Sequence, residues 1–145
     1  MSRPKGPYSL HPPVMSVQIE NAMDIMIVRN TARRAAGLLG FTPAHQAQLA
    51  SAAATLADLV LKTGDLHAVH FSGVVNNEKK GIQVSIAMPW LAGISQPNVL
   101  IALRSKLGSL VDEILVEGDN PPTVIMVMWR GSTDAGDVDD SSGLG

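Results

Sequence analysis

Apolar positions recur along the chain at spacings that predict strands and helices in turn. Residues 14–20 alternate around Val17 and Ile19, which is typical of a strand with one buried face. After Asn21 the period changes to that of an amphipathic helix, with arginines on the face opposite the apolar one. The apolar positions of this helix are Ile25, Val28, Ala32, Ala35 and Leu39, and the arginines are Arg29, Arg33 and Arg34.

The boundary between this helix and the next is marked by four consecutive residues. Gly40 can adopt the left-handed conformation that ends a helix, and Phe41 can fold back onto the last turn. Thr42 and Pro43 then begin a second helix, because threonine caps free N–H groups and proline loses no hydrogen bond at the first helical position. Its apolar stripe consists of Leu49, Ala53, Leu56 and Val60, with Gly64 as the predicted stop.

The rest of the chain predicts mostly strands. Residues 67–75 and 81–88 are rich in strand formers and are joined by a polar turn, which predicts a hairpin. A short helix follows, from the spacing of Leu100, Leu103, Leu107, Leu110 and Val111, and then strands at 113–117 and 123–129. This order predicts an α+β fold: a two-layer α/β sandwich with helices on one face of a mixed, mostly antiparallel sheet.

Composition limits the chain to one domain. Its 145 residues, of which 46% are apolar, fill one core but are too few for two ordinary domains. Residues 1–13 form a Pro-rich head and residues 131–145 an acidic Gly/Ser-rich tail, and neither can bury enough apolar surface to order itself. We therefore expect a folded domain at 14–130 between two disordered ends.

Charge and cysteine content point to a cytoplasmic protein. The chain lacks cysteine, as a reducing compartment permits, and prolines interrupt the region where an export signal needs an apolar stretch. Its apolar runs fall far short of the roughly 20 residues that span a bilayer. A net charge of -2 provides no general attraction to nucleic acid. We expect neither a membrane nor a nucleic acid as partner.

The block from Ile19 to Gly64 resembles the anti-sigma-factor serine kinases and stress-response switch kinases. The similarity is carried by residues 24–33, by Leu38-Leu39-Gly40-Phe41-Thr42 and by the helix at 46–60, and it continues through both hairpins. Those proteins have the GHKL ATPase (Bergerat) fold, so the resemblance implies that fold here, with a truncated lid. It also implies a protein partner: a sigma factor, a STAS-type antagonist or a phosphatase.

The first nucleotide box of that family is altered in this sequence. On the second helix Thr55 occupies the position of a catalytic Glu, and Leu59 that of an Asn that holds magnesium. Threonine is not a general base at ordinary pH, and leucine offers no oxygen to a cation. Asp58 is adjacent but points about 100° away from Leu59 around the helix.

The second box is altered as well, and the Gly-rich lid that should follow it is missing. Pro89 replaces the adenine-reading Asp, Leu91 replaces the first glycine, and Gly93 alone remains. The resemblance therefore implies no catalytic, cofactor-binding or metal-binding residues. We expect a non-catalytic module that binds a regulatory protein in bacterial partner-switching control of transcription or stress response.

Other functions remain open from the sequence. The main alternative is an active ATP-dependent serine/threonine kinase, or anti-sigma factor, that binds Mg-ATP in a divergent pocket. A scaffold that assembles through the edge of its sheet, including a homodimer, is another possibility. An unrelated enzyme is a further alternative, because catalytic groups meet in space rather than in sequence.

Several side chains have both a functional and a structural interpretation. Arg29, Arg33 and Arg34 suit a docking surface for an acidic partner, but also an ordinary solvated helix face. Trp90 could be an exposed residue that contacts a partner, or a side chain that fills the former nucleotide pocket. His67 and His70 should face opposite sides of a strand and so bind no metal together. The methionines at 23, 26, 126 and 128 are expected in the core.

Overall fold

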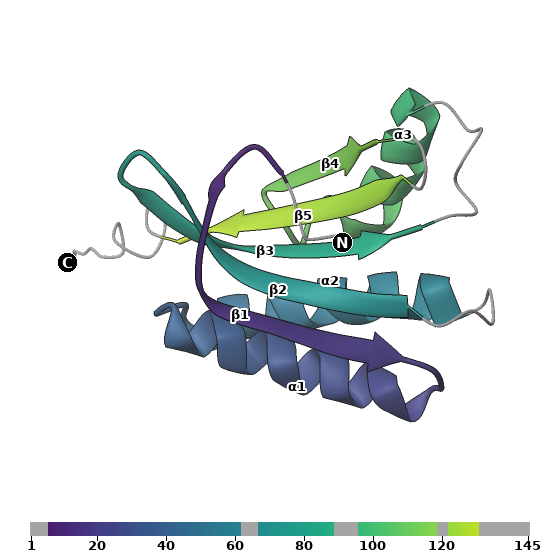
Figure 1. Cartoon of the computed structure of the whole chain (residues 1–145), viewed down its shortest axis with the longest axis horizontal. Helices are drawn as coiled ribbons and strands as arrows, with labels where there is room; N and C mark the ends of the chain where they lie inside the picture. The colour runs from purple at the N-terminus through teal and green to yellow at the C-terminus, as the bar shows by residue number, and fades with distance from the viewer. Residues whose placement is uncertain (1–5, 62–66, 89–95, 119–121, 131–145) are drawn as a thin grey trace.

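The computed structural model describes residues 6–61, 67–88, 96–118 and 122–130 of the chain (Figure 1). Its elements follow the predicted order of strands and helices. They are β1 (Ser9–Ile19), α1 (Met23–Leu38), α2 (Pro43–Leu61), β2 (His67–Asn76), β3 (Lys79–Ala87), α3 (Gln96–Leu107), β4 (Glu113–Glu117) and β5 (Thr123–Trp129). The predicted fold class, α+β, is confirmed.

The strands form one open five-stranded sheet in the order β1-β2-β3-β5-β4. Every neighbouring pair of described strands is antiparallel, so the expected mixed sheet is wrong for this part of the chain. The crossover through α3 does bring β4 into the same direction as β3. However, β5 lies between them and is antiparallel to both, so no parallel pair forms.

The helices cover one face of the sheet, which gives the predicted two-layer arrangement (Figure 1). The core between the layers is built from alternate strand residues such as Phe71, Ile82 and Met126, all fully buried. Many of the facing helix positions are alanines, which allow close approach of the helices. The alanines buried there are Ala32, Ala35, Ala36, Ala50, Ala52, Ala53 and Ala57.

The junction between α1 and α2 has the predicted geometry. Gly40 has a positive φ of 88°, and the N–H of Phe41 donates to the carbonyl of Ala36 at 3.0 Å. Together with the bond from Gly40 N–H to Gly37, also 3.0 Å, this is a Schellman ending, and Phe41 is buried at 4% exposure. The hydroxyl of Thr42 then accepts from the N–H of His45 and caps α2.

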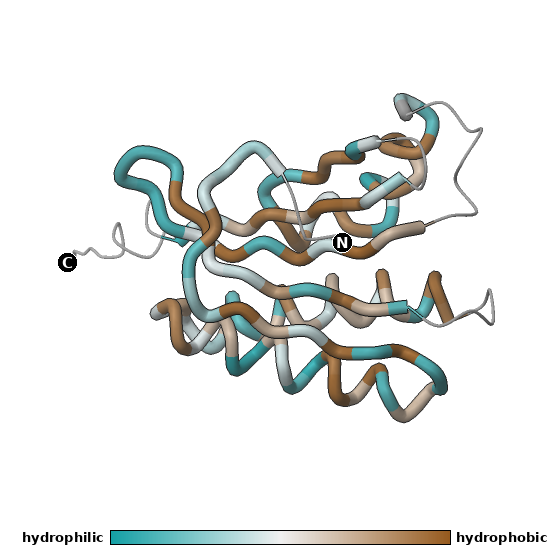
Figure 2. Tube along the Cα trace, viewed as in Figure 1, coloured by the Kyte–Doolittle hydropathy of each residue, from teal (hydrophilic) through white to brown (hydrophobic). Residues whose placement is uncertain are grey.

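Two boundaries in the second half of the chain differ from those expected. The β2–β3 hairpin is longer than predicted, because its turn consists only of Asn77 and Glu78, and Asn77 takes a positive φ of 58°. In addition, α3 ends at Leu107, since the following residues form tight turns. Leu110 and Val111 therefore lie beyond the helix. Figure 2 shows the polar tip of the hairpin next to the largely hydrophobic central strands.

The first strand begins earlier than expected, so the head is not disordered throughout. Ser9, Leu10 and His11 pair with β2, and after a register shift Val14 pairs with Ser72. Pro12 and Pro13 fall within that shift, as expected for residues that cannot donate to a ladder. The domain therefore extends at least five residues beyond the predicted start at residue 14. Residues 1–5 and the predicted acidic tail lie outside the described residues.

The face of the sheet away from the helices has a small apolar cluster of its own. Val74, Ile125 and Val127 are buried there and pack with Tyr8, Leu115 and Trp129. The start of the chain arches across this face before β1 joins β2 (Figure 1). None of the described helices is long and apolar enough to cross a membrane.

Candidate protein-binding surface

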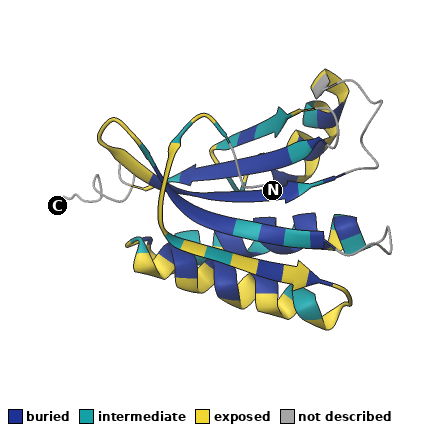
Figure 3. Ribbon diagram, viewed as in Figure 1, coloured by how far each residue is buried: buried dark blue, intermediate teal, exposed yellow. Residues whose placement is uncertain are grey.

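The solvent side of α1 exposes large apolar side chains. Met23, Met26 and Ile27 have exposed fractions of 76%, 64% and 50%, and Leu38 at the far end of the helix has 64%. Positions 23, 26 and 27 are spaced i, i+3, i+4, so the first three are neighbours on the helix surface. We call Met23, Met26 and Ile27 the apolar patch of α1. The outer side of α1 is the exposed edge of the molecule in Figure 3.

The exposure of Met23 and Met26 contradicts the prediction that they belong to the core. Only Met126 and Met128 are buried as predicted, at 0% and 4% exposure. The side of α1 that faces the sheet is occupied by Val28, Ala32 and Ala35, as the periodicity predicted. Since successive residues turn by about 100°, Ile27 and Met26 must point away from that side.

The three predicted arginines share this outer side. Arg29, Arg33 and Arg34 are all exposed. Arg33 lies seven residues after Met26 and Arg34 seven after Ile27, so each is two turns further along nearly the same line of the helix. The helix therefore presents an apolar patch at its start and positive charge beyond it.

No carboxylate of α1 offsets this charge. Asp24 is the only acidic residue of the helix, and its Oδ2 accepts from the backbone N–H groups of Glu20 and Asn21 at 2.7 and 3.2 Å. That interaction fixes the entry to α1, where a negative charge also favours the helix dipole. The arginines lie more than a turn further along the helix.

The two positions on α2 that the resemblance assigns to the first nucleotide box, Thr55 and Leu59, serve the structure of the helix. The hydroxyl of Thr55 donates to the carbonyl of Ser51 at 2.9 Å, and Leu59 is partly buried against the core. Asp58 is exposed. The remaining predicted positions, Pro89, Trp90, Leu91 and Gly93, lie outside the described residues.

His67 and His70 face opposite sides of β2, as predicted. His67 is buried and pairs in register with the core residue Ile19, whereas the Nδ1 of His70 lies 2.8 Å from the hydroxyl of Ser16 on the other face. Burial lowers the pKa of His70. Among the described residues no three His, Cys, Asp or Glu side chains are grouped to hold a metal.

A polar cluster that the sequence did not reveal joins both ends of the domain. The carboxylate of Glu113 accepts from the hydroxyl of Tyr8 at 2.7 Å and from the indole N–H of Trp129 at 2.6 Å. The Tyr8 and Trp129 rings meet edge to face at 4.9 Å, and the ammonium of Lys79 lies 5.6 Å from the Trp129 ring. The bond to Glu113, followed by burial, raises the pKa of Tyr8.

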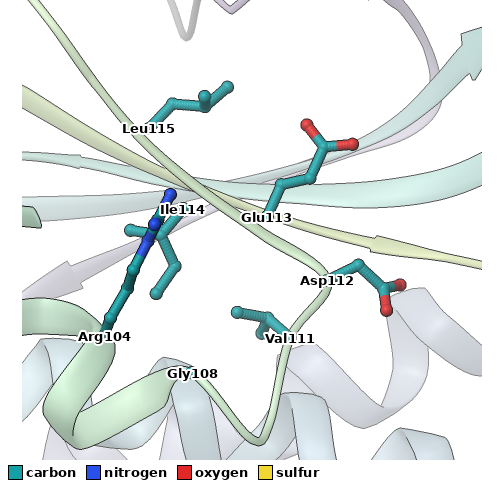
Figure 4. Close-up of a pocket in the computed structure, with 7 residues that line it drawn as sticks. All are labelled: Arg104, Gly108, Val111, Asp112, Glu113, Ile114 and Leu115. Carbon is teal, nitrogen blue, oxygen red and sulfur yellow. The ribbon is translucent and has the colours of Figure 1, made fainter.

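Two pockets lie near β4 and away from the box positions on α2. The larger, about 260 Å³, is bounded by the end of α3 and by β4 (Figure 4). The smaller, about 120 Å³, lies between the start of α2 and the end of β5. Thr55 and Leu59 line neither of them.

The fold and this surface define an α+β domain with an exposed, apolar and basic helix face. In comparisons with known proteins, no family model matches the chain, and no curated protein matches its sequence.

Proposed function

We propose that this protein is a non-catalytic regulatory module that binds another protein through the outer face of α1. The observation that carries the proposal is the apolar patch of Met23, Met26 and Ile27, more than half exposed on average, beside Arg29, Arg33 and Arg34. Exposed apolar clusters next to charge are typical of interaction sites. The partner that fits this surface combines apolar side chains with acidic ones.

The apolar and the basic parts of the surface have different roles. Burial of methionine and isoleucine side chains supplies affinity, and methionine adapts its shape to different partners. The arginines attract an acidic partner and set its orientation, since charge complementarity acts mainly on the association rate and on specificity. The two roles can be separated by experiment.

The resemblance to anti-sigma-factor kinases supports a particular kind of partner. It favours a sigma factor, a STAS-type antagonist or a phosphatase in cytoplasmic partner switching, on a GHKL-like domain that has lost its nucleotide site. Support for the loss comes from α2, where the Thr55 hydroxyl is already bonded within the helix and Leu59 packs against the core. Threonine is not a general base at ordinary pH, and leucine offers no oxygen to magnesium.

Calorimetric titration with Mg-ATP and Mg-ADP tests the non-catalytic part of the proposal. We expect no heat of binding at millimolar nucleotide, because the residues that would orient water and hold the metal are absent from α2. Micromolar binding would contradict the proposal and would make phosphotransfer to a protein substrate the next assay.

Affinity measurements on surface variants test the binding part. A partner captured with the wild-type protein and purified would be titrated against Met26→Ser/Ile27→Ser and against Arg33→Glu/Arg34→Glu. We expect each pair to weaken binding by about tenfold or more, and the charge reversal to slow association at low salt. Matched controls are Lys80→Glu and Lys106→Glu, which reverse exposed charges on other elements. Equal affinity of the α1 variants and the wild type would overturn the proposal.

A further inference from the structure

The outer edge of β4 is open to pairing with another strand. β4 pairs with β5 on one side, and within the described part of the chain it is the last strand of the sheet. An edge strand presents unpaired N–H and C=O groups that can accept a further strand. The opposite edge is less suited to this, because β1 carries Pro12 and Pro13 at a register shift. β4 contains no proline.

A groove runs beside this edge, between β4 and the end of α3. It encloses about 260 Å³ and is lined by Arg104, Gly108, Val111, Asp112, Glu113, Ile114 and Leu115. Val111 and Ile114 supply an apolar part, and Gly108 leaves one wall without a side chain (Figure 4). A peptide backbone that paired with β4 would place alternate side chains over this groove.

Arg104 is the basic side chain among the residues that line the groove, and Asp112 and Glu113 are the acidic ones. Arg104 extends from α3 toward β4, whereas the carboxylates of Asp112 and Glu113 point away from it (Figure 4). Both carboxylates are occupied elsewhere: Glu113 by Tyr8 and Trp129, and Asp112 by the backbone N–H of Trp129 at 2.6 Å. Arg104 is exposed and can pair with an incoming carboxylate in bidentate geometry.

We propose that the groove between α3 and the outer edge of β4 binds an extended, acidic segment of a protein partner. The segment pairs with β4 as a sixth strand. One of its apolar side chains contacts Val111 and Ile114, and its carboxylate pairs with Arg104. This surface is separate from the outer face of α1 and does not depend on the function proposed for that helix.

Synthetic peptides and the full-length protein test this inference. The probe is a capped heptapeptide of alternating valine and threonine with one central aspartate, and the matched control has lysine in place of aspartate. Backbone amide NMR would follow residues 104–117 during titration. We expect shifts along β4 with the aspartate peptide and about tenfold weaker binding of the lysine peptide. Arg104→Gln should remove this difference and Arg104→Glu should reverse it.

A second control removes strand pairing without changing the protein. Methylation of the peptide backbone nitrogens that face β4 should abolish binding, because these positions can no longer donate to the strand edge. Unchanged binding of the methylated peptide, or equal binding of the aspartate and lysine peptides, would overturn the proposal.

Two further experiments would show whether the groove is occupied by this chain itself or by a second copy of it. If only a variant truncated after Arg130 bound the peptide, the occupant would be the acidic end of the chain itself and not a partner. If sedimentation showed a dimer that the peptide dissociates, the occupant would be a second copy. Either result would overturn the assignment to a partner. Substitutions on α1 should leave peptide binding unchanged, which distinguishes this site from the one proposed above.

Discussion

The hydroxyl of Tyr8 donates a 2.7 Å hydrogen bond to the carboxylate of Glu113, across 105 positions of the sequence. It ties the beginning of the chain to the first residue of β4, the strand at the far edge of the sheet from β1. Trp129 on β5 occupies the second carboxylate oxygen, so Glu113 holds the start of the chain against two strands.

Removal of this hydrogen bond should destabilise the domain by a measurable amount. Tyr8→Phe keeps the ring contact with Trp129 but deletes the donor, and we expect the free energy of unfolding to fall by about 1 kcal/mol, as for a partly exposed hydrogen bond. Tyr8→Ala should cost more, because it also removes the ring. Chemical denaturation measures both variants. Identical midpoints for Tyr8→Phe and the wild type would show that the contact contributes nothing.

The stability of the domain should depend on pH through His70. Burial lowers its pKa below the ordinary value of 6.5, and its strand neighbours Ser16 and Ser85 are uncharged. The unfolded chain therefore takes up the proton first, so the free energy of unfolding should fall as pH drops below about 6.5 and level off below the folded pKa.

The measurement is urea unfolding of the wild type and of His70→Gln between pH 7.5 and pH 5. The variant should lose stability less steeply over this interval, and His11→Gln, an exposed histidine, should behave like the wild type. Parallel curves for His70→Gln and the wild type would rule out this source of pH dependence.

Substitution by alanine should have opposite effects on the stability of the domain at two glycines near the end of α1. Gly40→Ala places a Cβ at a φ of +88° and 2.6 Å from the Nη1 of Arg130, so we expect a loss of about 1–2 kcal/mol. Gly37 lies within the helix, and a Cβ there would meet the Gln46 side chain at an ordinary 3.5 Å. Gly37→Ala should stabilise by about 0.4–1 kcal/mol. Thermal unfolding compares them, and shifts of the same sign would contradict the assigned geometry.

Alanine substitutions of Met126 and Met26 test which of the two methionines belongs to the core. Met126 is fully buried in β5, and Met126→Ala should cost about 2–5 kcal/mol of unfolding free energy. Met26 is 64% exposed, and Met26→Ala should change stability by no more than about 0.5 kcal/mol. Denaturant titration of both variants is sufficient. A large cost for Met26→Ala would mean that α1 packs through its outer face.

Local features of the fold could be predicted from the sequence, because neighbours along the chain determine them. The glycine at 40 and the phenylalanine after it specify the end of α1, and Asn77 permits the tight β2–β3 turn. The periodicity that placed Val28 and Ala32 on one side of α1 also left the arginines in solvent, as observed.

The tertiary structure alone decided which apolar residues remain exposed and which distant residues meet. Apolar side chains occupy much of the circumference of α1, and periodicity identifies residues that share a face without showing that only one face has a partner layer. Met23 and Met26 were therefore assigned to the core, although the sheet covers the other side of the helix. The contact of Tyr8 with Glu113 and the insertion of β5 beside β3 depend on long-range strand pairing, which local spacing does not encode.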